Sequence, residues 1–244
     1  MSAARGASPP GVTGEREAAR WVRAMFGRVA PRYDLLNHLL SFNVDRYWRA
    51  RTVKLLKPVL ARRSARVLDL CCGTGDLLLA LQRAAGRPLT GADFAHPMLL
   101  RARAKAPESP LIEADALSLP LADSSLDLIT AAFGFRNLAS YERGLAEMLR
   151  VLKPGGTAAI LEFSEPSRRL YAGLYRFYSG RVLPLIGGLI SGDPSAYRYL
   201  PDSVSKFPGP DKLAAAMRAC GFVSVEYRRM TGGIVALHIG QRPL

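Results

Sequence analysis

The segment Val67–Asp76, V-L-D-L-C-C-G-T-G-D, constrains the fold of this chain more than any other. Its first residues predict a buried strand, and the residues that follow predict a glycine-rich turn leading into a helix. Gly73 and Gly75 have no Cβ, so the backbone can turn tightly there and lie against a ligand. The start of the next helix offers unpaired N–H groups. This order of elements is typical of a nucleotide-binding α/β fold.

Two further markers refine the kind of nucleotide. The fingerprint of NAD-binding proteins has a third small residue three positions after the second glycine. This chain has Leu78 at that position, so NAD binding is disfavoured. The next apolar strand ends at Asp93, about 20 residues after the glycine turn, where a carboxylate can bind ribose hydroxyls. In E-A-D-A, the Asp115 carboxylate and the following backbone amide of Ala116 are placed to hydrogen-bond an adenine edge.

Length and cysteine content point to one reduced α/β domain. With 244 residues the chain can bury a substantial core. Three cysteines are too few for a disulfide framework, and the adjacent Cys71 and Cys72 are interpreted as small packing residues in a cytoplasmic protein. We find neither a charged-then-apolar leader nor a run of 18 apolar residues, so neither secretion nor a membrane span is expected.

The net charge of +14 is concentrated at the two ends of the chain. Residues 1–64 carry 13 basic and 4 acidic side chains, residues 65–165 carry 10 and 12, and residues 166–244 carry 11 and 4. Basic flanks suit an anionic membrane surface or a nucleic acid, and solubility alone is an equal alternative.

Periodicity divides the chain into five stretches. Residues 1–14 predict a disordered tail, residues 15–64 two or three helices that cap the site, and residues 65–165 a cofactor-binding core. Residues 166–208 form an insertion, and residues 209–244 a last helix and a hairpin around T-G-G. In the core we expect strands at 66–71, 89–93, 111–114, 127–133 and 157–163, helices at 76–85, 97–105 and 141–151, and, at the end of the chain, a helix at 211–220 with strands at 222–230 and 233–241.

Several longer strings resemble known enzymes. The three cofactor markers, with D-L-I-T-A-A-F at 127–133 and L-K-P-G-G at 152–156, resemble the class I S-adenosylmethionine-dependent methyltransferases. R-Y-D-L-L-N-H-L-L-S, D-R-Y-W-R, F-G-F-R-N, L-E-F-S-E-P, Y-x-Y-L and T-G-G-I-V-A-L-H are similar to the menaquinone and ubiquinone biosynthesis C-methyltransferases. This resemblance covers nearly everything after residue 20.

The resemblance implies a Rossmann-like α/β fold with a mostly parallel seven-stranded sheet, an antiparallel last strand, an N-terminal helical cap and a helical insertion. It implies methyl transfer from S-adenosylmethionine to a ring carbon of demethylmenaquinol or, alternatively, of a methoxy-polyprenyl-benzoquinol. The implied cofactor contacts are Asp69, Gly73, Thr74, Gly75, Asp93, Asp115 and Ala116. Two residues depart from the family pattern: Ala132, where many relatives have serine, and Phe135, which we expect to reshape the pocket slightly.

The chemistry requires a group that stabilises a quinol oxygen as it loses its proton, whereas the sulfonium methyl needs neither an acid nor a metal. Arg136 and Asn137 follow the carboxyl end of the fourth core strand, where open α/β sheets place ligands. Because arginine stays protonated, we assign Arg136 charge stabilisation and water positioning, and an ion pair with a helix carboxylate is the alternative. His38 is a candidate proton acceptor, with a packing role as the alternative.

The remaining candidates lie in the cap and the insertion. Tyr33 and Asn37 in the cap, and Tyr197 and Tyr199 in the insertion, are candidate substrate contacts, and the last two can equally be packing residues. Apolar residues and arginines in the insertion predict either docking on a membrane surface or a helix pair buried against the core or a second subunit.

Two other functions account for part of the sequence. A nucleic-acid methyltransferase would explain the basic flanks, but the N-P-P-Y-like string typical of amino-directed enzymes is replaced here by F-G-F-R-N and no RNA-binding module is recognised. We therefore expect no nucleic-acid partner. The second rival is a cofactor-binding scaffold without turnover, against which the intact cofactor markers argue.

Overall fold

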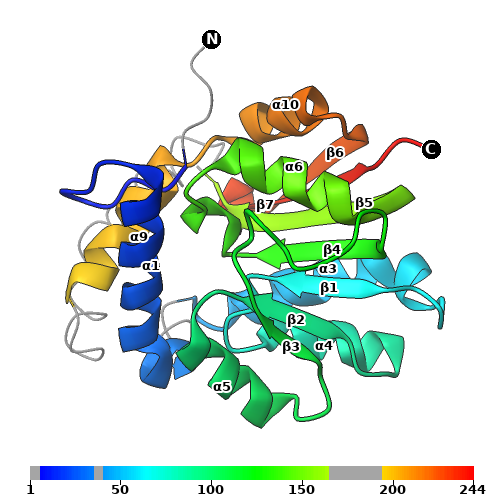
Figure 1. Cartoon of the computed structure of the whole chain (residues 1–244), viewed down its shortest axis with the longest axis horizontal. Coiled ribbons are helices and arrows are strands. Elements are labelled where there is room, and N and C mark those ends of the chain that lie inside the picture. The colour runs from blue at the N-terminus through cyan, green and yellow to red at the C-terminus, as the bar shows by residue number, and fades with distance from the viewer. Residues whose placement is uncertain (1–5, 36–40, 165–193) are drawn as a thin grey trace.

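The computed structural model describes residues 6–35, 41–164 and 194–244, which build a seven-stranded sheet with helices on both faces (Figure 1). The strands lie in the order β3-β2-β1-β4-β5-β7-β6. The first five strands pair in parallel, and β7 runs antiparallel to both of its neighbours. This confirms the predicted sheet and its antiparallel last strand. The strands are β1 Val67–Leu70, β2 Thr90–Asp93, β3 Leu111–Glu113, β4 Leu126–Ala132, β5 Leu152–Phe163, β6 Val223–Met230 and β7 Val235–Gln241.

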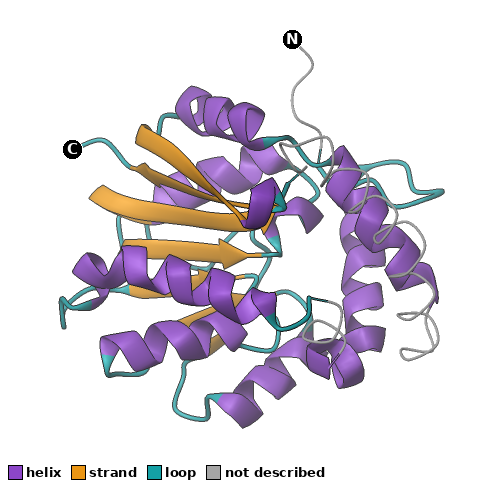
Figure 2. Cartoon of the chain, turned by 180° about the vertical axis from the view of Figure 1, so that it is seen from behind, coloured by secondary structure: helices purple, strands orange, loops and turns teal. Residues whose placement is uncertain are grey.

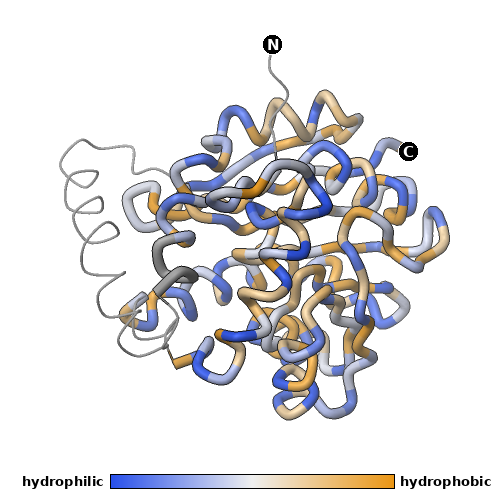
Figure 3. The backbone as a smooth tube through the Cα atoms, turned by 60° about the vertical axis from the view of Figure 1, so that its left-hand side comes forward, coloured by the Kyte–Doolittle hydropathy of each residue, from blue (hydrophilic) through white to orange (hydrophobic). Residues whose placement is uncertain are grey.

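The central strands are apolar on both faces because helices cover both. Helices α3 (Val44–Leu60) and α4 (Asp76–Ala85) pack on one face, and α6 (Tyr141–Val151) and α10 (Pro210–Cys220) on the other. In β4, Leu128 belongs to the core beneath α3 and α4, and the next residue, Ile129, belongs to the core beneath α6 and α10. Successive side chains of a strand point to opposite faces, as this pattern requires. Along the outer helices hydrophobic and hydrophilic residues alternate (Figure 3), as expected of helices with one buried face.

A third, smaller core lies beyond the carboxyl ends of the strands. It is formed by α1 (Glu15–Val29), α5 (His96–Lys105) and α9 (Pro194–Lys206), through Val22, Met25, Met98 and Tyr199. Helices α1 and α9 stand side by side at this end of the sheet (Figures 1 and 2). With the short η1 (Ala30–Arg32) and α3, α1 confirms the predicted helices before the first strand.

Ion pairs attach α1 to the sheet domain. Arg23 pairs with Glu113 at the end of β3. At the start of α1, Glu15 pairs with Arg143 of α6 at 3.0 Å. The cap is therefore joined to the fold by charged side chains as well as by the third core.

One expectation about an element boundary was wrong. Strand β5 begins at Leu152 instead of residue 157, because Leu152 pairs with Leu126 and the backbones of Gly155 and Gly156 exchange hydrogen bonds with Arg242. The segment L-K-P-G-G thus belongs to the sheet. Residues 6–14 contain neither helix nor strand, and the amide of Ala7 donates to the Leu138 carbonyl at 2.7 Å.

Within the three described ranges, no helix is long and apolar enough to cross a membrane. In the same ranges, no three His, Cys, Asp or Glu side chains come together as metal ligands. Residues 165–193, which include most of the insertion predicted at 166–208, lie outside the described residues, and the rest of the insertion forms α9 from Pro194 to Lys206.

A candidate active site at the carboxyl ends of the strands

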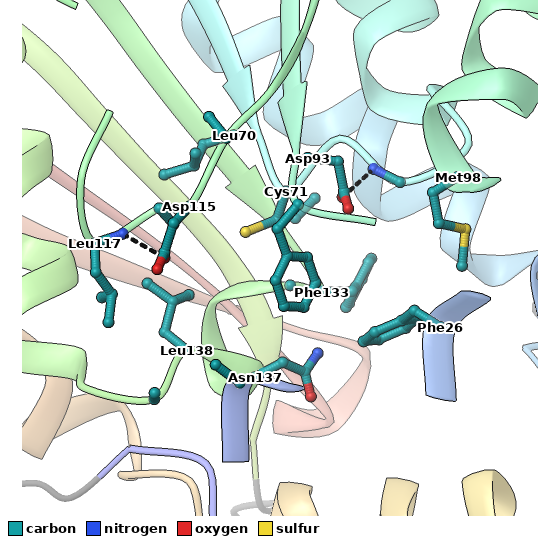
Figure 4. Close-up of a pocket in the computed structure, with 18 of the residues that line it drawn as sticks. Phe26, Leu70, Cys71, Asp93, Met98, Asp115, Leu117, Phe133, Asn137 and Leu138 are labelled. Carbon is teal, nitrogen blue, oxygen red and sulfur yellow. Dashed lines mark hydrogen bonds between the residues drawn. The ribbon is translucent and has the colours of Figure 1, made fainter. Parts of the chain in front are cut away.

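A pocket with an empty volume of about 710 Å³ lies where β1 to β4 end and the third core begins (Figure 4). The order of strands reverses between β1 and β4, and such a switch point is where open α/β sheets bind ligands. The lining residues are Ala19, Phe26, Tyr33, Leu70, Cys71, Gly73, Asp93, Phe94, Met98, Ala114, Asp115, Ala116, Leu117, Ala132, Phe133, Gly134, Asn137, Leu138 and Ala139.

The glycine turn forms one wall of the pocket. Cys71, Gly73 and Gly75 have φ values of 52°, 55° and 89°, so three of five consecutive residues are left-handed. Gly73 lines the pocket. Gly75, which precedes α4, is not a lining residue, and a Cβ on it would lie 3.3 Å from the Ala102 side chain. The second glycine therefore allows α5 to approach the turn closely.

Asp93 holds the turn in place. Its Oδ2 accepts a hydrogen bond from the Gly73 amide and its Oδ1 one from the Ala95 amide, each at 2.9 Å. Burial raises the pKa of Asp93 to about 6, against the lowering effect of these backbone hydrogen bonds. The side chain thus lines the pocket and also fixes the turn relative to β2 (Figure 4).

The opposite wall carries the third sequence marker. Asp115 and Ala116 both line the pocket. Asp115 Oδ1 accepts a hydrogen bond from the Leu117 amide at 2.9 Å, which orients the carboxylate. Leu117 and Leu138 add apolar surface beside it (Figure 4). A flat ring with a polar edge fits such a wall.

Asp69 lies in β1, just before the pocket residues Leu70 and Cys71. Its Oδ1 accepts a hydrogen bond from the Thr130 hydroxyl at 2.7 Å, whereas its buried Oδ2 has no partner among the described residues. Burial raises the pKa of Asp69 to about 7, although Thr130 acts in the opposite direction. A cationic ligand group would stabilise the ionised form of this carboxylate.

Thr74 is not a lining residue and belongs to a polar cluster that we call the latch, formed by Asp34, Thr74, Asp76 and Lys105. The Thr74 hydroxyl donates to Asp34 and accepts from Lys105 Nζ at 3.1 Å. Lys105 also pairs with Asp34 at 2.7 Å and with Asp76 at 2.6 Å. The latch joins the cap segment after α1 to the glycine turn, α4 and α5.

Replacing Asp34 by asparagine is expected to loosen the cap without removing it. The change keeps the side-chain size but removes the charge that pairs with the partly exposed Lys105, a loss of about 1 kcal/mol. Amide hydrogen exchange over residues 15–35 should accelerate about fivefold. Asp123→Asn, which breaks a surface pair with Arg150, is the control and should leave this segment unchanged. Equal exchange in Asp34→Asn and the wild type would contradict a latch.

Arg136 and Glu162 form a buried ion pair beside the pocket. Arg136 follows β4 in the short helix η2 (Phe135–Asn137), and its Nη1 lies 2.9 Å from Glu162 Oε1 in β5. Its Nε donates to the Ser203 hydroxyl at 3.3 Å. Burial disfavours the charged guanidinium, but Glu162 outweighs this effect and raises the pKa of Arg136. Arg136 thus forms the ion pair that was the alternative to its catalytic role, but its partner is a carboxylate of a strand and not of a helix. Arg136 does not line the pocket.

Asn137 is the polar side chain that the end of β4 places in the pocket. Its Oδ1 accepts a hydrogen bond from the Tyr199 hydroxyl at 3.2 Å. Its Nδ2 is buried without a hydrogen-bond partner among the described residues. Figure 4 shows the nitrogen directed into the pocket and the oxygen away from it. An oxygen of a bound molecule could therefore accept from Nδ2.

The other predicted residues fall in three groups. Tyr33 lines the pocket from the cap. Tyr199 does not line it but contacts Asn137. Asn37 and His38, as well as the side chain of Tyr197, lie outside the described residues.

One interpretation of an individual residue was wrong. Phe135 does not line the pocket, because it is fully buried against Tyr141 and Phe207. Cys71 packs against the core as expected, and it also lines the pocket. Its position directly between a strand and the glycine turn was the signal for this role. The lining residues Phe26 and Met98 had no such signal, since the packing of α1 and α5 brings them to the site.

The order of strands and the pocket at their carboxyl ends are those of the class I S-adenosylmethionine-dependent methyltransferase fold. A S-adenosylmethionine-dependent methyltransferase from Thermotoga maritima, titled a possible histamine N-methyltransferase, superimposes with a TM-score of 0.66 at 18% identity, covering 91% of this chain and 99% of that one. The [4+2]-cyclase SpnF superimposes with a TM-score of 0.64 at 16% identity over the whole of both chains. At these identities the likeness concerns the fold alone.

The chain belongs to the ubiE/COQ5 methyltransferase family, whose sequence model matches residues 12–242. It is 53% identical to a demethylmenaquinone methyltransferase from Thermus thermophilus, over 90% of this chain and 100% of the relative. A protein of the same name from Deinococcus radiodurans is 46% identical over 96% of this chain and 97% of the relative. The ubiquinone/menaquinone biosynthesis C-methyltransferase UbiE of Geobacter sulfurreducens is 44% identical over 93% and 91%.

Proposed function

We propose that this protein transfers the methyl group of S-adenosylmethionine to a ring carbon of a polyprenylated quinol, converting demethylmenaquinol to menaquinol. The observation that carries this proposal is the 53% identity to the Thermus demethylmenaquinone methyltransferase over the whole length of that relative. The pocket supports it, because ionisable and apolar groups are arranged there for a cationic nucleoside on one side and an aromatic ring on the other.

The residues around the glycine turn fit the cofactor. We assign the ribose hydroxyls to Asp93, and the adenine edge to the Asp115 carboxylate and the Ala116 amide. The unpartnered, buried Oδ2 of Asp69 suits the positive charge of the methionine part. Gly73 leaves room for the ligand beside the turn. Thr74 and Gly75 support this site by positioning the cap and α5.

The ring-binding part of the pocket combines aromatic side chains with one amide. Phe26, Tyr33 and Phe133 line it, and Asn137 Nδ2 is directed into it. When bound, S-adenosylmethionine supplies an activated methyl group, which forms a carbon–carbon bond to the ring as its bond to sulfur breaks. Asn137 donates a hydrogen bond to the quinol oxygen as that oxygen loses its proton.

Arg136 contributes to this step from outside the lining of the pocket. We propose that its protonated guanidinium, which is paired with Glu162, fixes the turn that carries Asn137 and orients water near the developing phenolate. His38 remains our candidate for the proton acceptor. The carbon that gains the methyl group then loses its own proton, the quinol oxygen takes a proton back as the ring regains its aromaticity, and the donor leaves as S-adenosylhomocysteine.

A methoxy-polyprenyl-benzoquinol is the second candidate substrate, because the Geobacter relative is named for both ubiquinone and menaquinone biosynthesis. We further propose that the protein works at the surface of a membrane, where the isoprenoid tail of either quinol resides. The apolar and arginine-rich segment 166–193 is the proposed contact, and a homodimer through this segment is the alternative.

Labelled S-adenosylmethionine with chemically reduced demethylmenaquinol, and in parallel with reduced methoxy-polyprenyl-benzoquinol, tests the proposal. We expect label in menaquinol and none with the oxidised quinones, because only the quinol oxygen can push electrons into the ring. Label in both quinols would indicate a shared enzyme. No label in either, despite measurable cofactor binding, would overturn the substrate assignment.

A further inference from the structure

Helix α9 contacts the F-R-N turn at two neighbouring points. The Tyr199 hydroxyl donates to Asn137 Oδ1 at 3.2 Å. The Ser203 hydroxyl accepts from Arg136 Nε at 3.3 Å. Tyr199 and Ser203 are four residues apart and so lie on the same face of the helix. This face of α9 is therefore bound to both residues to which we assign the chemistry.

The contact with Tyr199 selects one of two orientations of the Asn137 carboxamide. A carboxamide can rotate by half a turn, which exchanges its donor and its acceptor. With Tyr199 donating to Oδ1, the Nδ2 group is directed into the pocket (Figure 4). In the opposite orientation the buried phenol proton would lose this acceptor, which is unfavourable. Burial raises the pKa of Tyr199 to about 12, so the phenol remains a donor at neutral pH.

Packing holds the phenol in this place. Tyr199 is 3% exposed and belongs to the third core. Its ring lies 5.0 Å from that of Trp21 in α1, measured between centroids. The phenol of α9 is thus fixed between Trp21 of the cap and Asn137, and it does not line the pocket.

We infer that Tyr199 is a positioning residue, which orients Asn137 so that Nδ2 faces the quinol oxygen. The inference rests on the proposed function, and it assigns to Tyr199 a role through Asn137 in place of the direct substrate contact expected from the sequence. It also makes the alignment of the site depend on α9, which lies within the predicted insertion.

A double-mutant cycle with Tyr199→Phe and Asn137→Ala tests this inference. Phenylalanine keeps the ring against Trp21 and removes only the hydroxyl. We expect kcat for quinol methylation to fall about tenfold in Tyr199→Phe, with the KM for S-adenosylmethionine and the Tm nearly unchanged. In the Asn137→Ala background the same change should alter kcat less than twofold, because the group that it positions is gone. Tyr227→Phe, which removes a surface hydrogen bond to Asp211, is the matched control and should leave kcat unchanged.

Two results would overturn the inference. Equal losses from Tyr199→Phe in both backgrounds would mean that the phenol touches the substrate itself, and no loss in the wild-type background would mean that the hydroxyl is dispensable. The side-chain amide resonance of Asn137 in a proton–nitrogen NMR spectrum gives a readout without turnover. It should shift in Tyr199→Phe and stay in place in Tyr227→Phe, and an unchanged resonance in Tyr199→Phe would refute the positioning role even if no quinol were methylated.

Discussion

Replacing Glu162 by alanine is expected to lower the free energy of unfolding by about 3–5 kcal/mol, measured by urea denaturation. The reason is that Arg136 is buried and its guanidinium pairs with Glu162 Oε1 at 2.9 Å. Glu162 Oε2 also accepts from the Arg136 amide at 3.1 Å, so the change leaves a buried cation and a backbone donor without this acceptor. Such a loss is a large fraction of the stability of a typical domain.

Glu15→Ala is the matched control for this prediction. It removes the same type of side chain from a pair with an arginine, at a similar distance of 3.0 Å, but these side chains are 53% and 59% exposed. An exposed pair of this kind contributes less than about 1 kcal/mol. Equal effects of the two changes would mean that the Arg136–Glu162 pair is hydrated and contributes no more than a surface pair.

Replacing Asp93 by asparagine is expected to raise the Kd for S-adenosylmethionine about 100-fold, measured by titration calorimetry. Two losses combine. The amide that replaces one carboxylate oxygen cannot accept from both Gly73 and Ala95, so the glycine turn loses one of its two attachments to this side chain. The charge that would bind the ribose hydroxyls also disappears, and hydrogen bonds to a charged group are the stronger ones.

Asp127→Asn provides the control for Asp93. Asp127 Oδ2 accepts from the Arg66 amide at 2.9 Å, so the same change disturbs the same kind of hydrogen bond. Asp127 lies at the opposite end of β4 from the pocket. Its variant should bind the cofactor within about twofold of the wild type. Wild-type affinity in Asp93→Asn would rule out our assignment of the ribose.

The spacing of apolar residues along the sequence correctly predicted the helices and strand ends that depend on residues close to one another in the chain. The expected helices 76–85 and 141–151 coincide with α4 and α6, because their apolar spacing and their flanking residues lie within the segments themselves. Gly73, Asp93, Asp115 and Asn137 were expected at strand ends, and all four line one pocket. Parallel strands bring their carboxyl ends to one edge, so a strand prediction already brings such residues together.

Contacts between distant segments were not predictable in the same way. The acceptor for Thr74 is Asp34, and the partner of Arg136 is Glu162, separated by 40 and 26 residues. Nothing in the local sequence distinguishes these carboxylates from exposed ones. Lys153 to Gly156 were expected outside the sheet because proline and glycine disfavour strands, but pairing with the end of the chain overrides that preference. Tertiary packing therefore decided each of these cases.

The position of β7 has a consequence for the order in which the protein can be assembled. Strand β6 pairs only with β7 among the strands that the structure describes, and β7 separates it from β5. During synthesis on the ribosome, β6 therefore emerges with no edge to join, and one edge of β5 stays open until the final strand follows. The parallel part of the sheet, from β3 to β5, can form while the chain is still being made, whereas the antiparallel part cannot close until β7 has been synthesised.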